Sequence, residues 1–387
     1  MKKICFITTI SGTIKSFLVD YAYFLVDKYG YDVTFICDND DSMYSYCNEK
    51  IHYIPVSMKR GVNLDFLHAP YRLYRIFKRE RFDIIQYSTP NAALYASIAG
   101  KLAGFSNRLY CQWGIRYMGY DSGVKRRLFK VIEKITCSCS TIIECESFSL
   151  WKFSISEGLY NADKSSVIGK GSACGVNLAR YNLANKSGWR KEVREKLDIS
   201  EDARVFGYCG RITRDKGLNE LFAAFRRVVE DKKRKTDTYL LIIGQDDNAE
   251  SINPELLAWA KSSPNVKFTG YTNNVPKYYS ALDVFTSLSY REGFGLVVIE
   301  AAAMAVPAIV SNVPGQVDTI ENGKTGLLVS VKNINEVVLA MNSFIANPVL
   351  SKKMGEDARI FVESKFEQIS LFNLLALHKN QIIAEKS

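Results

Sequence analysis

The stretch Tyr290–Gly315, YREGFGLVVIEAAAMAVPAIVSNVPG, places two glycines and two acids around the expected start of a helix. Gly293 and Gly295 stand just before this helix, which we expect to begin near Leu296. Free backbone N–H groups and the positive end of the helix would then face outward from a flexible turn. Such a turn can cradle a diphosphate.

The two acids of this stretch, Glu292 and Glu300, lie 8 residues apart, on either side of the turn. Glu300 stands beside Val297, Val298 and Ile299, an apolar setting in which an unpartnered carboxylate is costly. It needs a partner, and ligand hydroxyls would serve. A purely structural alternative stays open, in which Glu292 caps the helix and Glu300 lies on its solvated face.

A second cluster, GYCGRITRDKG at Gly207–Gly217, follows an expected strand and opens a helix. Arg211 and Lys216 can both point at the crevice where the strand ends. Two cations suit a diphosphate leaving group, because they bind it and neutralise the charge that develops as the bond to it breaks. Taken alone this signal is weak, since a Lys-Gly turn before a helix is common.

Metal and nicotinamide sites are disfavoured by what these segments contain. Asp246 and Asp247 are adjacent rather than spaced as Asp-x-Asp, and we interpret them as a turn. The 3 histidines are scattered singly. Gly12 follows the first expected strand, where backbone approaches phosphate in doubly wound sheets, but a full G-x-G-x-x-G is absent. We expect no metal and no cofactor, with cations taking the place of a metal.

Apolar, β-branched runs alternate with amphipathic stretches along the chain, as in strands joined by crossover helices in a parallel sheet. The expected strands of the first half are Ile4–Thr9, Val33–Cys37, Ile84–Tyr87, Leu109–Gln112 and Thr141–Cys145. Those of the second half are Val205–Cys209, Tyr239–Ile243, Val266–Phe268, Val284–Ser287, Ala308–Val310 and Gly326–Val329. The segment Gly169–Asn177 is rich in small residues and is interpreted as a connector.

The fold class is therefore α/β, with two doubly wound parallel-sheet (Rossmann-like) domains facing across a cleft at the carboxyl ends of their strands. The 387 residues, 47% of them apolar, are enough for two packed domains. We predict domains at residues 1–172 and 173–365, and a C-terminal helix at 366–387 that crosses back to the first domain.

The charge and the apolar runs bear on localisation. No segment has the roughly 20 apolar residues of a spanning helix, and the N-terminus does not resemble a signal peptide, so we expect a cytoplasmic protein with reduced cysteines. The net charge is +10. Two cation-rich stretches, Tyr71–Phe82 and Gly123–Lys134, look like basic amphipathic helices. Either these faces are merely solvated or they meet an anionic membrane; nucleic acid is disfavoured because no reading module accompanies them.

Together these segments resemble the family 4 retaining glycosyltransferases of the GT-B fold, over essentially the whole chain. The most specific match is the E-x7-E motif Glu292–Glu300, followed by NGKTGLLV at Asn322–Val329. Three further segments occur in the family's order: FDIIQYSTPNAALYASIAGKLAG at Phe82–Gly104, CGVNLARYN at Cys174–Asn182, and GRITRDKG at Gly210–Gly217.

The resemblance implies roles for individual residues. Arg211 and Lys216 would hold the diphosphate, Glu292 would contact donor-sugar hydroxyls, and Glu300 would take the ribose hydroxyls. Arg211, Lys216 and Glu292 form the implied catalytic set. The nucleobase would lie near residues 244–246 and 270–272. The implied donor-binding set is Gly12, Gly210, Arg211, Lys216, Gly244, Tyr271, Thr272, Glu292, Gly293, Phe294, Gly295, Leu296 and Glu300.

One departure from the family pattern concerns the end of the fourth N-terminal strand. Many members carry a histidine before the glycine there, whereas this chain has Gln112-Trp113-Gly114 and continues IRYMGY. This form resembles the subset that builds bacterial capsule and O-antigen chains. Gln112, Trp113 and Arg116 are the acceptor-side candidates for the space of the missing imidazole.

The implied function is transfer of a hexose or N-acetylhexosamine-type sugar from a UDP-sugar to a polyprenyl-diphosphate-linked saccharide, with retained anomeric configuration. The leaving diphosphate would help to deprotonate the acceptor. The implied partners are the nucleotide sugar, the lipid-linked saccharide and an anionic membrane surface, with peripheral association at the inner face of the cell membrane. Two alternatives stay open: a GT-B-fold UDP-hexosamine epimerase, for which no suitable histidine is seen, and a non-catalytic scaffold, which has little reason to keep both acids and both cations.

Overall fold

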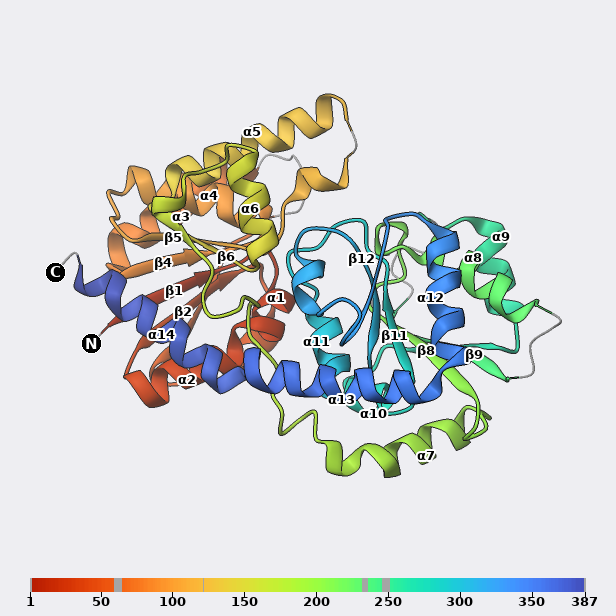
Figure 1. Ribbon diagram of the computed structural model, residues 1–387. Helices are drawn as coiled ribbons and strands as arrows, with labels where there is room; N and C mark the ends of the chain where they lie inside the picture. Colours follow the sequence, from red (N-terminus) through yellow and green to blue (C-terminus); the bar gives the residue numbers. More distant parts are fainter. Residues whose placement is uncertain (1, 59–64, 121, 232–235, 246–250, 386–387) are drawn as a thin grey trace. The chain divides into compact units, whose positions relative to one another are not determined.

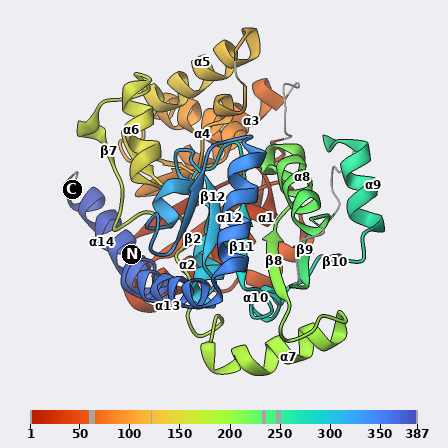
Figure 2. The ribbon, with the colours of Figure 1, turned by 45° about the vertical axis from the view of Figure 1, so that its right-hand side comes forward.

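The computed structural model describes residues 2–58, 65–120, 122–231, 236–245 and 251–385. They form two α/β units, one comprising Met1–Gly175 with Ile369–Ser387 and the other comprising Val176–Gln368 (Figure 1). Figure 2 shows the same ribbon turned by 45°. None of the helices in this described part of the chain is long and apolar enough to cross a bilayer.

The first unit contains a 7-stranded sheet in the order β3-β2-β1-β4-β5-β6-β7, with every neighbouring pair parallel. Its strands are β1 (Lys3–Ile7), β2 (Asp32–Cys37), β3 (Ile51–Pro55), β4 (Ile84–Tyr87), β5 (Arg108–Gln112), β6 (Ile142–Cys145) and β7 (Ser165–Ser166). Its helices are α1 (Ser11–Phe17), α2 (Val19–Tyr29), α3 (Asp65–Glu80), α4 (Pro90–Leu102), α5 (Val124–Cys139) and α6 (Phe148–Ser156). Central strands such as β4 are buried along their whole length, because helices cover both faces of the sheet.

The second unit contains a 6-stranded parallel sheet in the order β10-β9-β8-β11-β12-β13. Its strands are β8 (Arg204–Cys209), β9 (Thr238–Ile243), β10 (Val266–Gly270), β11 (Val284–Ser287), β12 (Ala308–Ser311) and β13 (Gly326–Val329). Its helices are α7 (Lys186–Lys196), α8 (Leu218–Val229), α9 (Pro254–Ser262), α10 (Val275–Tyr279), α11 (Leu296–Ala303), α12 (Ile334–Ala346) and α13 (Pro348–Lys365). The predicted fold class, two doubly wound parallel α/β domains, is confirmed.

The last helix, α14 (Gln368–Ala384), is fastened to the first unit by a buried charge cluster. Glu144 in β6 accepts a contact from His378 Nδ1 at 2.7 Å and from Lys379 Nζ at 3.5 Å. The side chains of Glu144 and Lys379 are only 7% and 1% exposed. Burial alone would raise the pKa of Glu144, but the Lys379 ammonium and the His378 hydrogen bond outweigh it and lower this pKa to about 2.

We predict that Glu144→Gln destabilises the first unit at pH 7. Lowering the Glu144 pKa from 4.5 to about 2 corresponds to about 3 kcal/mol of folding free energy. Because the folded-state pKa is depressed, this stability is present above pH 4.5 and is lost as the pH falls toward 2. Urea unfolding at pH 7 and pH 3, with hydrogen exchange of α14 peptides, measures both effects.

The control is Asp163→Asn, which removes the same charge from an exposed carboxylate. It should change stability at pH 7 by less than about 0.5 kcal/mol. Equal stability of Glu144→Gln and the wild type at pH 7 would show that the buried cluster does not hold α14.

Candidate functional site

The predicted donor residues of the second unit lie on connections that follow neighbouring strands. Gly210 comes after β8, Gly244 after β9, and the segment Ser289–Gly295 follows β11. Because all these strands are parallel, their carboxyl ends meet at one edge of the sheet. The sequence pattern thus becomes a single cluster in space.

Close backbone contacts hold these connections together. A Cβ atom on Gly244, which has φ +150°, would lie 2.0 Å from the carbonyl oxygen of Gly210. A Cβ atom on Gly315, at φ +88°, would lie 2.4 Å from the carbonyl oxygen of Gly293. Only glycine allows such an approach at a positive φ. The sequence motif includes Gly315 but does not by itself reveal that the turn requires a glycine at this position.

Two of the three implied catalytic residues form an ion pair. Lys216 Nζ lies 2.5 Å from Glu292 Oε1, and the Ser289 hydroxyl donates to the same oxygen at 2.7 Å. Both charged side chains are half-buried, at 24% and 17% exposure, so each can still reach a ligand. Arg211, on the same connection as Lys216, is exposed. A diphosphate would offer Lys216 a second anionic partner, and sugar hydroxyls would offer Glu292 new donors.

The start of α11 has no side-chain cap within the described structure. Gly295 occupies the N-cap position at φ +105° and supplies no capping side chain. The alternative in which Glu292 caps this helix is therefore wrong, because its carboxylate is directed to Lys216 and Ser289 instead. The N–H of Val298 donates to the Gly295 carbonyl at 2.9 Å, so within the described residues the N–H groups of Leu296 and Val297 are the ones that could meet an anionic group.

Glu300, on α11, is a half-buried carboxyl group whose surroundings disfavour its charged form. Desolvation raises its pKa to about 7, against opposing contributions from Tyr181, Arg180 and Tyr279. The Tyr279 hydroxyl is itself buried without a hydrogen bond of full geometry to any described residue. A ligand hydroxyl could therefore be shared between the carboxyl group and this phenol.

Three further residues of this edge were not identified from the sequence. Tyr181 and Tyr279 flank Glu300, with their ring centroids 6.4 Å apart. Gln316, fully buried, donates through Nε2 to the Ser287 carbonyl at 2.8 Å, while its Oε1 has no partner among the described residues. Tyr181 lies inside the CGVNLARYN segment, so its position in a motif was the available signal.

The expected nucleobase region is more open. Tyr271 is exposed, and its hydroxyl donates to Asn273 Oδ1 at 2.8 Å. Thr272 accepts a hydrogen bond from the Asn274 N–H at 3.1 Å. Gly244 is half-buried at the end of β9. The pair 246–247, interpreted from sequence as a turn, lies outside the described residues.

Gly12 belongs to the first unit, whereas the cluster described above belongs to the second. It is exposed in the first turn of α1, but the neighbouring N–H of Ser11 already donates to Asp38 Oδ1 at 2.6 Å. Asp40 accepts from the Ser11 hydroxyl and from Lys15, which holds the pKa of this carboxyl well below its usual range. Two carboxylates beside Gly12 disfavour a phosphate at this position.

The three acceptor-side candidates have different surroundings. Gln112 is fully buried: its Nε2 donates to Glu133 at 2.8 Å, and its Oε1 accepts from Tyr160 at 2.8 Å. Trp113 is half-buried, with its ring 5.4 Å from that of Phe17.

The guanidinium of Arg116 lies 4.1 Å from the ring centroid of Phe129. Gln112 thus serves the core of the first unit rather than facing a ligand. Only Trp113 and Arg116 are accessible enough to contact an acceptor.

Comparisons with known proteins identify glycosyltransferases along nearly the whole chain. The family described as Glycosyl transferases group 1 matches residues 190–361, and that described as Glycosyl transferase 4-like matches residues 3–147. The capsular polysaccharide biosynthesis glycosyltransferase CapM of Staphylococcus aureus is 30% identical over 386 residues, covering 99% of this chain and 98% of the relative. The UDP-Gal:alpha-D-GlcNAc-diphosphoundecaprenol alpha-1,3-galactosyltransferase of Escherichia coli is 23% identical over 325 residues, covering 83% and 82%.

Solved structures show the same fold. A glycosyltransferase from Rickettsia africae superposes with a TM-score of 0.80 at 22% identity, covering 100% of this chain and 99% of that one. Anabaena HepE in complex with UDP superposes with a TM-score of 0.78 at 17% identity, covering 98% and 100%. Both neighbours therefore share the arrangement of two parallel-sheet domains.

We predict that Glu300→Ala weakens UDP binding at least tenfold, because a buried hydroxyl left without its partner costs about 1–3 kcal/mol. Ligand hydroxyls favour the ionised carboxylate, so binding should lower the Glu300 pKa from about 7 and release a proton. UDP affinity should consequently rise from pH 6 to pH 8 more steeply in the wild type than in Glu300→Gln. Calorimetric titration at several pH values measures both.

Glu300→Gln is the matched control, because UDP itself titrates in this range and only the difference in slope belongs to Glu300. Equal affinity of Glu300→Ala and the wild type would sink the assignment of this residue to the nucleotide.

Proposed function

The chain belongs to the GT-B glycosyltransferases with a Glycosyl transferase 4-like first domain and a group 1 second domain, and from this premise we propose the reaction it catalyses. The enzyme transfers a hexose or N-acetylhexosamine-type sugar from a UDP-sugar to a polyprenyl-diphosphate-linked saccharide in capsule or O-antigen synthesis. It retains the anomeric configuration and needs no metal. The observation that carries the donor side is the cluster of Lys216, Glu292 and Glu300 at one sheet edge.

The acceptor proposal rests on the relatives. CapM acts in capsular polysaccharide biosynthesis, and the Escherichia coli relative acts on a diphosphoundecaprenol-linked GlcNAc. The chain matches 98% of the first relative and 82% of the second. In this proposal the first unit binds the acceptor, with Trp113 and Arg116 as its contact residues.

The chemistry proposed for the donor side follows from the charges. As the bond to the diphosphate breaks, negative charge grows on the leaving oxygen, where preorganised cations stabilise it most. Lys216 and Arg211 are placed on one connection to do this. Before the donor binds, Glu292 compensates Lys216. When phosphate takes over that role, the Glu292 carboxylate becomes free to orient the sugar hydroxyls. The departing diphosphate then accepts the acceptor proton, so no protein base is required.

The decisive assay follows UDP release from UDP-sugars with and without a short polyprenyl-diphosphate-linked GlcNAc acceptor. We expect release that depends on the acceptor, survives EDTA, and gives a product whose anomeric configuration, measured by NMR, matches the donor. Arg211→Ala should lower kcat at least 100-fold, whereas Arg226→Ala, which removes an exposed cation of α8, should not.

Other outcomes identify the alternatives. Sugar conversion without acceptor would indicate an epimerase, and absence of any turnover with all donors and acceptors would indicate a scaffold. Loss of activity in EDTA with recovery in Mg²⁺ would contradict charge neutralisation by Arg211 and Lys216.

We also propose that the first unit docks on an anionic membrane through α5. This helix exposes an apolar ridge, Val124, Leu128, Val131 and Ile135, at helical spacing. Lys125, Arg127 and Lys134 are exposed beside the ridge. An apolar face flanked by cations suits the boundary between headgroups and acyl chains.

Contacts within the first unit limit which cations of α5 are available to meet a membrane. Lys130 lies 2.6 Å from Glu157, and Arg126 lies 3.7 Å from the same carboxylate. Both also stand over the ring of Tyr117. These two side chains therefore bind α5 to its own unit, and the membrane would meet the other three. On α3, the cations Arg72, Arg75 and Lys78 are exposed.

We predict that the triple variant Lys125→Gln/Arg127→Gln/Lys134→Gln binds phosphatidylglycerol vesicles at least tenfold more weakly than the wild type at low salt. Each cation near an anionic leaflet contributes about 1 kcal/mol, and salt screens this attraction. Co-sedimentation at 0.05 M and 0.5 M salt measures it. Leu128→Gln/Val131→Gln should weaken binding at both salt concentrations, because it removes apolar contact.

The matched control Lys50→Gln/Lys152→Gln/Lys170→Gln removes equal charge from other exposed positions of the first unit. It should bind nearly as the wild type does. Equal loss in both triple variants would show a diffuse charge effect and no docking by α5, leaving a merely solvated basic face.

A further inference from the structure

A pocket of about 450 Å³ lies in the second unit where the strands of its sheet begin. Arg204 is the first residue of β8, and Asp283 immediately precedes β11. Helix α7 contributes Lys186 and Arg190, and the first turns of α13 contribute Lys352. Because the strands are parallel, this pocket is at the opposite edge of the sheet from the residues assigned to the donor.

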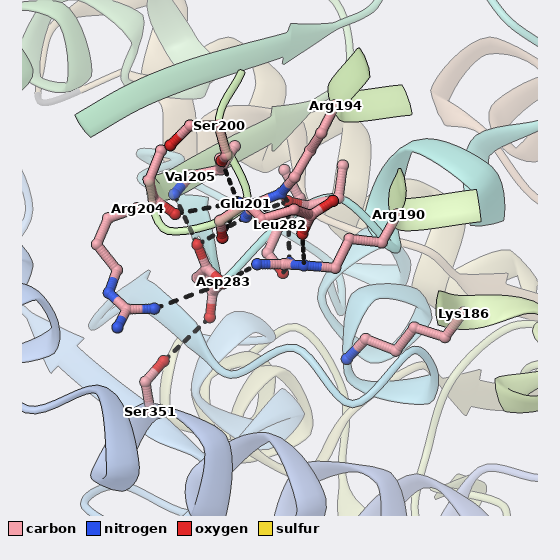
Figure 3. A network of polar contacts seen from close by, with 12 residues as sticks. Lys186, Arg190, Arg194, Ser200, Glu201, Arg204, Val205, Leu282, Asp283 and Ser351 are labelled. Carbon is pink, nitrogen blue, oxygen red and sulfur yellow. Dashed lines mark hydrogen bonds and ion pairs between the residues drawn. The ribbon is translucent and has the colours of Figure 1, made fainter. Parts of the chain in front are cut away.

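The carboxylate at the centre of the pocket is already fully used (Figure 3). Asp283 Oδ1 lies 2.9 Å from Arg190 Nη2, and Asp283 Oδ2 lies 3.0 Å from Arg194 Nη2. The backbone N–H of Val205 donates to Oδ2 at 2.8 Å. These contacts fasten α7 to the starts of β8 and β11, and they account for Asp283, Arg190 and the fully buried Arg194.

Three other cations are not accounted for by this fastening. Arg204 Nη1 is 3.9 Å from Asp283, and Arg204 Nε is buried without a partner among the described residues. Lys186 Nζ donates to the Ala305 carbonyl at 3.0 Å, and Lys352 is exposed. Burial first, and the neighbouring Arg190 second, lower the pKa of Lys186 to about 8, which shows that its charge is poorly compensated.

The acids that face the pocket do not restore neutrality. Glu201 lies 3.5 Å from Arg190 but its side chain is 57% exposed at the rim. Glu356, one turn along α13, acts on Lys186 only through space. Together with Asp283 they set three negative charges against the five cations described above. The positive end of the 18-residue helix α13 adds to the excess.

We propose that this pocket binds a small soluble ligand carrying a phosphate or diphosphate group. Arg204 offers planar guanidinium donors and Lys186 and Lys352 offer ammonium groups, which are the donors that phosphate oxygens prefer. A volume of about 450 Å³ is that of a small-molecule site and accommodates a sugar phosphate or a nucleotide. The site is separate from the one proposed for the donor and does not depend on that assignment.

Isothermal titration calorimetry with pyrophosphate as the probe tests this site. We compare the wild type with Lys186→Gln/Lys352→Gln and with Lys191→Gln/Lys353→Gln, a control that removes the same charge from exposed neighbours outside the pocket. The pocket variant should bind pyrophosphate at least tenfold more weakly, and the control should bind it as the wild type does.

Arg211→Ala removes a cation of the proposed donor site and should leave the pocket's binding event intact. Lys186→Arg keeps the charge and should retain binding, which separates loss of the site from misfolding of the glutamine variant. Equal affinity in the pocket variant and the control overturns the proposal. So does binding that is lost in Arg211→Ala alone, or that requires more than about 10 mM pyrophosphate. Displacement of pyrophosphate by phosphatidylglycerol vesicles would overturn a soluble ligand in favour of a headgroup.

Discussion

Backbone crowding at the carboxyl edge of the second sheet is the constraint on which the candidate site depends. Gly210 and Gly244 approach so closely that a Cβ on the second would lie 2.0 Å from the carbonyl oxygen of the first. Gly315 presses in the same way against Gly293. These contacts bring together the connections that follow β8, β9, β11 and β12. Without them, a cation on one connection could not reach an acid on another.

Charge compensation within this layer explains why the site can exist without a ligand. Lys216 and Glu292 neutralise each other at 2.5 Å, so neither is left as an unpaired charge. Glu300 differs, because burial raises its pKa to about 7. At neutral pH this carboxyl group is therefore partly protonated and carries its full charge only part of the time. The proposed anionic, hydroxyl-rich donor would satisfy both arrangements at once, because phosphate would replace Glu292 beside Lys216 while hydroxyls would solvate the two acids.

The sequence was sufficient for the fold class and for most of the sheet, because central parallel strands are continuous apolar runs bounded by turns. It missed β3, whose pattern IHYIP contains a histidine and a proline, and β7, which has only two residues. Motif spacing predicted Glu292, Glu300, Arg211 and Lys216 as site residues, and the structure brings two of them, Lys216 and Glu292, into contact. It could not supply Tyr181, Tyr279 and Gln316, since their role comes from packing against residues distant in the chain.

The same limit explains the different outcomes for Gln112 and for the basic helix α5. A glutamine at a strand end can face either solvent or core, and only the presence of Glu133 and Tyr160 settles that it faces the core. Charge counting in α5 likewise could not show that Arg126 and Lys130 are held by Glu157. In both cases a tertiary partner decides whether a polar side chain is structural or available.

Parallel topology gives the second unit two polar edges of different kinds. At the carboxyl edge, the connections that follow the strands carry the side chains that we propose to meet the donor. At the amino edge, arriving helices must be fastened to the starts of the strands, and here Asp283 holds α7 through Arg190 and Arg194. To fasten α7, the structure would need no more positive charge than the Asp283 carboxylate can compensate. The excess at Lys186, Arg204 and Lys352 is what distinguishes a binding pocket from a structural joint.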